Sequence, residues 1–239
     1  MRCPPEVLNL LVMYPSDIFI AGGFIRACVS GEEINDIDIF VSDPAMALSI
    51  ASILSQKPDR KLIKTGNAIT VTGGKYTVQF IHKWVFTSPQ KAIESFDFTI
   101  AMGALWATKP YPQGTLIQGQ YGDVVWESIL HPDFYADLAS KRLMYTSPTR
   151  IEEAGGSMLR VLKFYQKGYR IPLDSLGAVI SRLVIGINPD SLPHRPSNHK
   201  KGDYTKEEAL GKAISNLLIE VDPEVDPNHI AHLPSNEDL

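Results

Sequence analysis

The sequence predicts an α+β fold, with a small mixed β-sheet that carries helices on one side, followed by a short helical C-terminal region. In the first 130 residues, short apolar segments with a period of two alternate with segments that have a helical period. After residue 130 only the helical period recurs. The chain has 239 residues and is 44% hydrophobic, which is enough for one sizeable core.

Residues 1–130 are expected to form a head domain that contains the sheet. Short apolar stretches predict its strands, and Gly73-Gly74 joins the last two of them as a hairpin. Periodic apolar residues predict its helices, the third of which begins at the capping sequence Ser42-Asp43-Pro44. The expected strands are 18–21, 36–41, 61–63, 68–72 and 76–81, and the expected helices are 6–12, 24–29 and 44–55.

The rest of the chain is expected to be helical up to an acidic tail. Apolar residues at helical spacing predict each helix, and a capping box at Thr205 to Glu208 predicts the start of the last one. The expected regions are a helical neck-like region at 131–190 (helices 134–145, 157–167 and 175–185), a basic linker at 191–204, a C-terminal helix at 205–219 and an irregular acidic tail at 220–239.

The charge balance does not exclude a nucleic-acid partner. The chain has 23 Lys and Arg against 27 Asp and Glu, a formal net charge of −4. Six of the acidic residues lie in the tail at 220–239, which has no Lys or Arg. The remainder of the chain is therefore slightly basic.

Composition also indicates the compartment. Cys3 and Cys28 are the only cysteines and no Cys/His pattern accompanies them, which excludes a disulfide framework and gives no support to a zinc site. No apolar run is long enough to span a bilayer, and the N-terminus lacks the pattern of a secretory signal. We therefore expect a cytoplasmic protein without a membrane partner, located in the host cytoplasm if its source is a virus.

A glycine pair between the first strand and the following helix suggests a phosphate-binding turn. Gly22 and Gly23 follow the apolar strand, and the helix that starts there carries Arg26 one turn later. Backbone N–H groups at a helix start suit an anion, and an arginine can add a bidentate contact to the same phosphate. The alternative is an ordinary tight turn with a surface arginine.

Two aspartates alternate on the next strand. The period of two places Asp36 and Asp38 on one face, while Ile37 and Ile39 lie on the other. Two adjacent carboxylates repel each other unless a cation lies between them, and hard oxygen ligands of this kind suit Mg²⁺. The alternative is an exposed strand edge with solvated aspartates.

The glycine pair and the aspartate pair together resemble a known active-site pattern, Gly-Gly-x-x-Arg, a glycine that closes the helix, and Asp-x-Asp. The segment is similar to the head domain of the DNA polymerase β-type nucleotidyltransferase superfamily, in the branch of bacterial-type CCA-adding enzymes and poly(A) polymerases, and its compact form resembles phage copies of this domain. The matching residues are Gly22, Gly23, Arg26, Gly31, Asp36 and Asp38.

A second segment of the same resemblance contains a third acid. The segment 95–105 is similar to the family motif Arg-Arg-Asp-Phe-Thr-Ile-Asn-Ala-Met and retains its acid as Asp97, at a turn into an apolar run that we expect to be helical. The resemblance implies that Asp97 is a third metal ligand or contacts the ribose; the alternative is a helix cap. Ser95 and Phe96 replace the two arginines of the motif, so the nucleotide contacts of those arginines are not carried over to this chain.

A third segment, 150–164, resembles the family sequence around Met-Leu-Arg. In this alignment Arg160 is retained as a nucleotide-binding residue, whereas Ala154 and Ser157 replace the Asp and Arg that read the incoming base. Alanine and serine cannot form the bidentate hydrogen bonds that this reading requires, which argues against faithful selection of C and A. Arg160 also begins a basic stripe with Lys163 and Lys167, which would bind nucleic-acid phosphates or form a solvated helix face.

The resemblance implies metal-dependent nucleotidyl transfer. Asp36 and Asp38 would hold one Mg²⁺, with Mn²⁺ as an alternative, and a second ion would be shared with Asp97. The substrates would be a nucleoside triphosphate, ATP included, and an RNA 3′ end, as in tRNA nucleotidyltransferases and poly(A) polymerases. Two alternatives stay open: the same chemistry on a protein, small-molecule or nucleotide acceptor, and a non-catalytic nucleotide-binding protein.

Overall fold

The computed structural model describes residues 3–108, 124–148, 154–186, 210–212 and 214–215. The chain divides into two compact units, Met1–Ser140 and Lys141–Leu239, and each is described by itself. In the described ranges, no helix combines the length and the apolar character that crossing a membrane requires.

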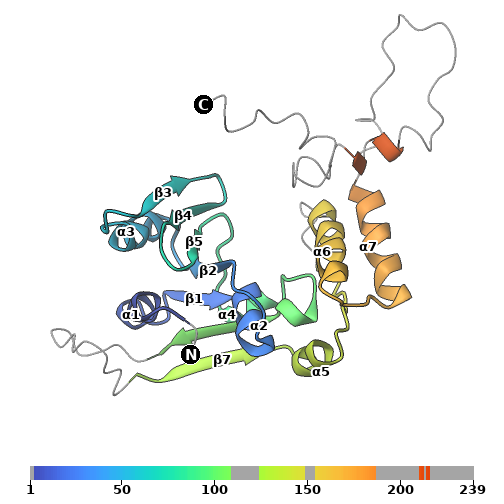
Figure 1. The fold of residues 1–239 in the computed structure, drawn as a ribbon, viewed down its shortest axis with the longest axis horizontal. Coiled ribbons are helices and arrows are strands. Elements are labelled where there is room, and N and C mark those ends of the chain that lie inside the picture. The colour runs from blue at the N-terminus through green and yellow to red at the C-terminus, as the bar shows by residue number, and fades with distance from the viewer. Residues whose placement is uncertain (1–2, 109–123, 149–153, 187–209, 213, 216–239) are drawn as a thin grey trace, which may run out of the picture. The chain divides into compact units, whose positions relative to one another are not determined.

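The first unit is built on a mixed seven-stranded sheet, which confirms the predicted fold class (Figure 1). The strand order is β3-β4-β5-β2-β1-β6-β7; the β2–β5 pair is parallel and the other pairs are antiparallel. The strands are β1 (Ile18–Ala21), β2 (Asp36–Val41), β3 (Lys61–Lys64), β4 (Ala68–Thr72), β5 (Thr77–Ile81), β6 (Gly103–Ala107) and β7 (Trp126–Leu130).

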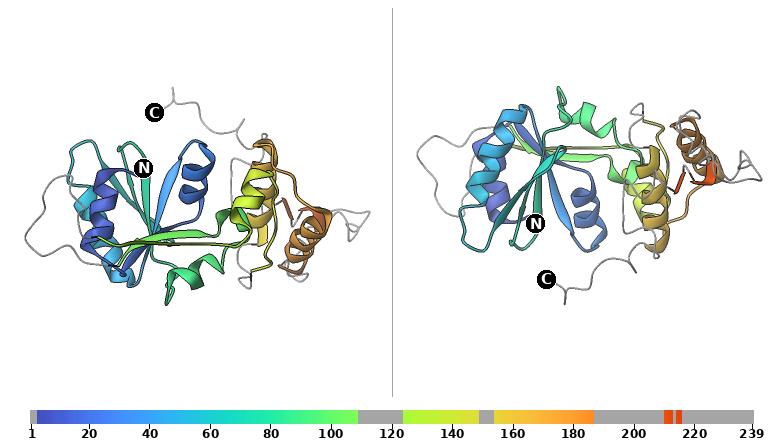
Figure 2. Two further views of the ribbon diagram at one scale, coloured as in Figure 1. Left: turned by 90° about the horizontal axis from the view of Figure 1, so that it is seen from below. Right: turned by 90° about the horizontal axis from the view of Figure 1, so that it is seen from above.

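Helices cover both faces of this sheet. The three longer ones, α1 (Pro5–Met13), α2 (Gly23–Ser30) and α3 (Pro44–Leu54), pack against one face, as the sequence predicts (Figure 2). The short helix α4 (Pro89–Ile93) packs against the opposite face (Figure 2). A 3₁₀ turn, η1 (Thr99–Ala101), leads into β6.

Strand alternation divides the buried side chains between the two faces. On β1, Ile18 and Ile20 belong to the core under α1 and α3, whereas Phe19 and Ala21 belong to the core under α4. All four residues of β1 are buried for this reason. Side chains thus pack on both faces of β1, which leads directly into the turn before α2.

Two predicted segments differ from the structure, and two elements of the first unit are additional. The run expected to be helical after Asp97 is η1 followed by β6, because a short apolar run buried on both faces has no period that separates a strand from a helix. The short helix α4 and the strand β7 were not predicted. The helix expected over 134–145 is α5 (Phe134–Ala139), which stops before Lys141, a residue with φ +54°.

The second unit contains a helical pair. The helices α6 (Ala154–Gln166) and α7 (Leu173–Gly186) pack against each other, close to the predicted ranges 157–167 and 175–185. Residues 210–212 and 214–215 are helical, within the predicted helix 205–219. The predicted linker and acidic tail lie outside the described residues.

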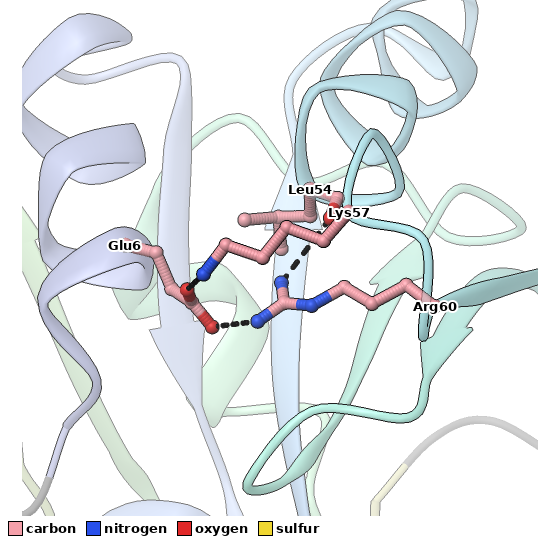
Figure 3. A network of polar contacts seen from close by, with 4 residues as sticks. All are labelled: Glu6, Leu54, Lys57 and Arg60. Atoms are coloured by element: carbon pink, nitrogen blue, oxygen red, sulfur yellow. Dashed lines mark hydrogen bonds and ion pairs between the residues drawn. The ribbon is translucent and has the colours of Figure 1, made fainter.

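A polar network attaches α1 to the loop that follows α3 (Figure 3). Glu6 accepts hydrogen bonds from Nη2 of Arg60 and, at 2.9 Å, from Nζ of Lys57, while Nη1 of Arg60 donates to the carbonyl oxygen of Leu54 at 3.2 Å. Burial acts to raise the pKa of Glu6, but the hydrogen bonds from Arg60 and Lys57 outweigh it and hold this pKa below its ordinary value. Glu6 is therefore favoured in its charged form.

Candidate active site

The turn between β1 and α2 has the conformation that a glycine-rich phosphate loop needs. Gly22 has φ +84°, a left-handed value that favours glycine, and it caps α2 without a side-chain hydrogen bond. Its N–H donates to the carbonyl oxygen of Gly103 at 3.0 Å and is therefore used within the fold. The N–H of Ile25 donates to the carbonyl oxygen of Gly22 at 3.1 Å, so the N–H groups of the first turn of α2 that suit an anion are those of Gly23 and Phe24.

Arg26 lies over this turn. A Cβ at Gly23 would be 3.7 Å from Nη1 and 3.8 Å from Nη2 of Arg26, so the end of the guanidinium group is next to the helix start. Nε of the same guanidinium is 3.4 Å from Oε2 of Glu32, and the two side chains are 11% and 15% exposed. Glu32 is thus on the Nε side of the guanidinium, and Nη1 and Nη2 are on the side of the turn.

Asp36 and Asp38 lie on β2 at the same end of the sheet as this turn. Ile20 pairs with Ile39 in the antiparallel β1–β2 pair, so the last residues of β1 are beside the first residues of β2. Both aspartates are half-buried and, by the period of two, share the face on which Phe40 is buried. Two carboxylates thus project together at the edge of the glycine turn.

The segment of Asp97 lies on that same face. Phe96 packs with Phe40 at a ring-centroid distance of 6.0 Å, and a Cβ at Gly22 would be 3.8 Å from its ring. Asp97 itself is 6% exposed. The sheet order places β1 between β2 and β6, so the chain returns to the glycine turn just before β6 begins. Three predicted site segments therefore meet at one end of the sheet.

The donor set of the aspartate pair suits a hard divalent cation. Mg²⁺ commonly takes only one or two carboxylates from a protein, and its other ligands are substrate phosphates and water. Asp36 and Asp38 supply such a pair. In the part of the chain that the structure describes, no three His, Cys, Asp or Glu side chains are grouped to hold a metal ion. Asp97 as a third ligand stays a prediction.

The fourth predicted nucleotide contact, Arg160, lies in the second unit, on α6. Its guanidinium is beside Gly156, where a Cβ would be 3.5 Å from Nη1. Its role as a nucleotide-binding residue stays a prediction. Of the two replaced base-reading positions, Ala154 begins α6 and Ser157 is only 1% exposed.

Several residues of the site were not singled out from the sequence. Glu32 directly follows the glycine that ends α2, and an acid at that point is a local signal for a partner of Arg26. Thr99 donates from Oγ1 to Oδ2 of the fully buried Asp137 at 2.6 Å, which ties the turn after Asp97 to α5. These two are 38 residues apart, so no local pattern could have paired them.

Solved structures similar to this chain are tRNA nucleotidyltransferases. A CCA-adding enzyme in complex with CTP superposes with a TM-score of 0.56 at 19% identity, over 96% of this chain and 50% of that one. The Thermotoga maritima CCA-adding enzyme complexed with tRNA gives 0.53 at 18% identity, over 92% and 53%. A tRNA nucleotidyltransferase with a primer tRNA and an ATP analog gives 0.51 at 18%, over 92% and 61%. The chain therefore has the polymerase β-type nucleotidyltransferase fold.

Sequence comparison identifies the family. The protein "Gabija anti-defense 2" of Bacillus phage SPbetaL7 is 27% identical over 157 residues, which are 65% of this chain and 34% of the relative. The chain thus spans about a third of that relative's length. The family model described as Gabija anti-defense 2 family protein matches residues 7–141, the sheet with its glycine turn and three aspartates. The chain belongs to the Gabija anti-defense 2 family.

Proposed function

We propose that this chain is a nucleotidyltransferase that transfers a nucleoside monophosphate from a nucleoside triphosphate to a hydroxyl group. The observation that carries the proposal is the juxtaposition of the Gly22-Gly23 turn, with Arg26 over it, and the Asp36/Asp38 pair on the adjacent strand. A triphosphate needs an anion cradle and a cation site side by side, and the two features supply both. The nucleotidyltransferase fold supports the same reading.

Each group has a role that follows from its chemistry. Asp36 and Asp38 would hold Mg²⁺, which when bound neutralises phosphate charge and increases the acidity of the acceptor hydroxyl. The first N–H groups of α2 and the Nη edge of Arg26 bind and orient the β- and γ-phosphates. The acceptor oxygen bonds to the α-phosphorus, the bond to the bridging oxygen breaks, pyrophosphate leaves and the hydroxyl proton passes to water.

The first candidate acceptor is an RNA 3′ end. The basic stripe of Arg160, Lys163 and Lys167 on α6 supports it, because phosphates of an RNA strand bind such side chains. The solved structures of similar fold include complexes with tRNA, which agrees with this candidate without deciding it.

A second candidate is a protein or small-molecule acceptor, favoured by one specific observation. Ser157 stands where the resemblance places a base-reading arginine, and its side chain is buried. A buried hydroxyl cannot form hydrogen bonds with the edge of a base. This position therefore cannot select C or A for addition to an RNA end. The family's description as anti-defense fits an enzyme whose product alters a host component.

The test is transfer of an α-labelled nucleotide. The full chain would be incubated with Mg²⁺ and each of the four nucleoside triphosphates, together with total RNA or total protein from a bacterial host. We expect label on a macromolecule and release of pyrophosphate, both lost in Asp36→Asn. Label on RNA supports the first candidate and label on protein the second. Pyrophosphate release from neither mixture would overturn the proposal and favour a non-catalytic nucleotide-binding protein.

A further inference from the structure

The described part of the second unit is strongly basic, although the whole chain has a formal net charge of −4. Residues 141–148 and 154–186 contain seven Lys or Arg residues and one acidic residue, Asp174. Such a local excess of positive charge attracts polyanions independently of the net charge of the chain. The question is therefore whether some of these side chains form a defined surface.

A short backbone pairing brings several of them together. The N–H of Arg170 donates to the carbonyl oxygen of Lys141 at 2.8 Å, and the N–H of Leu143 donates to the carbonyl oxygen of Arg170 at 2.9 Å. These bonds form a parallel bridge between Arg142 and Arg170. The side chains of the two arginines therefore project from the same face of the bridge. Lys141, Arg142 and Arg170 are all exposed.

An exposed aromatic ring completes this surface. Tyr165 is 58% exposed, and the guanidinium carbon of Arg170 lies 4.5 Å from the centroid of its ring. Nζ of Lys141 lies 4.7 Å from the centroid of the buried Tyr169 ring and donates to the carbonyl oxygen of Lys167 at 3.4 Å, which orients the lysine. We name Lys141, Arg142, Tyr165 and Arg170 the cationic patch.

We propose that the cationic patch binds single-stranded nucleic acid, with phosphates on Lys141 and Arg142 and a base stacked on the Tyr165–Arg170 pair. Cationic side chains beside an exposed aromatic ring are the combination that a single strand requires, because its bases are free to stack. An acidic protein would use the charges but would have no need of the ring and guanidinium pair. The proposal deepens the proposed function by naming the class of acceptor, and it rests on that function only for the transfer step.

The test is fluorescence anisotropy with the full chain and labelled single-stranded RNA or DNA of about 12 nucleotides, without nucleoside triphosphate. The charge-reversal variant Lys141→Glu/Arg142→Glu is expected to bind at least about tenfold more weakly and to reduce the slope of log K against log salt by about 1.4. Lys61→Glu/Lys64→Glu on β3 makes the same change of net charge at exposed positions and is expected to bind like the wild type.

Two further variants test the stacking. Tyr165→Ala is expected to weaken binding by about tenfold with an unchanged salt slope, since it removes a ring and no charge. Arg170→Lys keeps the charge and loses the planar group, so its binding is expected to weaken in the same direction. Thermal unfolding of each variant checks that the fold is kept.

The outcomes that contradict the proposal are distinct. It is wrong if the wild type binds neither oligonucleotide, if the β3 variant loses as much affinity as the patch variant, or if polyglutamate competes as well as an unlabelled strand. Tighter binding of duplex RNA than of a single strand would contradict the stacking. The ratio of the affinities for the RNA and the DNA oligonucleotide shows which of the two nucleic acids the cationic patch binds. Asp36→Asn should bind like the wild type, so a failure of transfer is separable from a failure of binding.

Discussion

Glu32 is placed to orient the side chain of Arg26. Oε2 of Glu32 lies 3.4 Å from Nε of Arg26, and Nη1 and Nη2 of the same guanidinium lie beside the start of α2. Both side chains are largely shielded from solvent, so the pair is screened less than a surface ion pair. We infer that Glu32 is a positioning residue, which acts on the triphosphate through Arg26.

This role predicts a kinetic signature. In Glu32→Gln the KM for the nucleoside triphosphate should rise by about three- to tenfold while kcat changes little, since the phosphate contact is weakened equally in the ground and transition states. Steady-state pyrophosphate release measures both constants. Glu33→Gln, at the neighbouring exposed glutamate, is the matched control. A fall in kcat with unchanged KM would contradict the positioning role.

Phe96 illustrates what a single residue changes in the site. The sequence shows only that an arginine of the related motif is missing there. In the structure the Phe96 ring packs against Phe40 and lies beside Gly22, so the position supplies an apolar wall to the glycine turn in place of a charge. Phe40 and Gly22 are far from Phe96 in the sequence, so no local pattern could have revealed this packing.

At the scale of elements, the β4–β5 hairpin depends on one glycine. Gly73 has φ +88°, and a Cβ there would overlap the backbone carbonyl oxygen of Asp59. Gly73→Ala should therefore lower the free energy of unfolding by about 2 kcal/mol or more, because the loop after α3 would have to move. The control is Gly66→Ala in an exposed turn, where a Cβ meets nothing within 4 Å.

Chemical denaturation of the two variants makes the comparison. A loss in Gly66→Ala as large as that in Gly73→Ala would contradict this account of the hairpin. The network around Arg60 contributes to the same contact, since a Cβ at the adjacent Gly74 would be 3.1 Å from Nη2 of Arg60. The hairpin and the α3–β3 loop are thus packed against each other through backbone as well as side chains.

The elements that the sequence predicts correctly are those with a clear period. The alternation of Ile37 and Ile39 with the aspartates gives β2 its bounds and its two faces. The Asp43-Pro44 start of α3 is confirmed, with the Asp43 side chain accepting from the Ala45 N–H at 2.8 Å. The strands β6 and β7 were missed because pairing partners far along the chain, and not local preference, decide their conformation.

In the candidate site, too, local patterns could be predicted from the sequence and long-range contacts could not. The glycine turn and the aspartate pair could be predicted because each is a local pattern whose chemistry suits an anion or a cation. The partners that orient them, Glu32 for Arg26 and Asp137 for Thr99, are set by the fold. Only the structure shows that the N–H of Gly22 is used by Gly103 and is therefore not offered to a phosphate.

At the scale of the whole molecule, stability should depend on pH through Glu6. Its pKa is held below the ordinary value of 4.5 in the folded state, so its contribution is present above the unfolded-state pKa and is lost as pH falls through the folded-state pKa. As the pH falls below about 4.5, the free energy of unfolding should therefore decrease less steeply in Glu6→Gln than in the wild type. Urea denaturation across that range measures it.

The matched control for this dependence is again Glu33→Gln, which changes an exposed glutamate. Glu6→Gln and the wild type should differ most near neutral pH and converge in acid. A difference in stability between them that stays constant across the whole acid range would show that the contacts of Glu6 with Arg60 and Lys57 act through packing and not through charge.

The central claim is that the aspartate pair on β2 serves nucleotidyl transfer. The most direct measurement is pyrophosphate release by Asp38→Ala, compared with the wild type and with Asp59→Asn at an exposed aspartate of the α3–β3 loop. We predict that Asp38→Ala abolishes release while its far-UV circular dichroism and thermal unfolding match the wild type, and that Asp59→Asn stays active. Release by Asp38→Ala at the wild-type rate would contradict the claim.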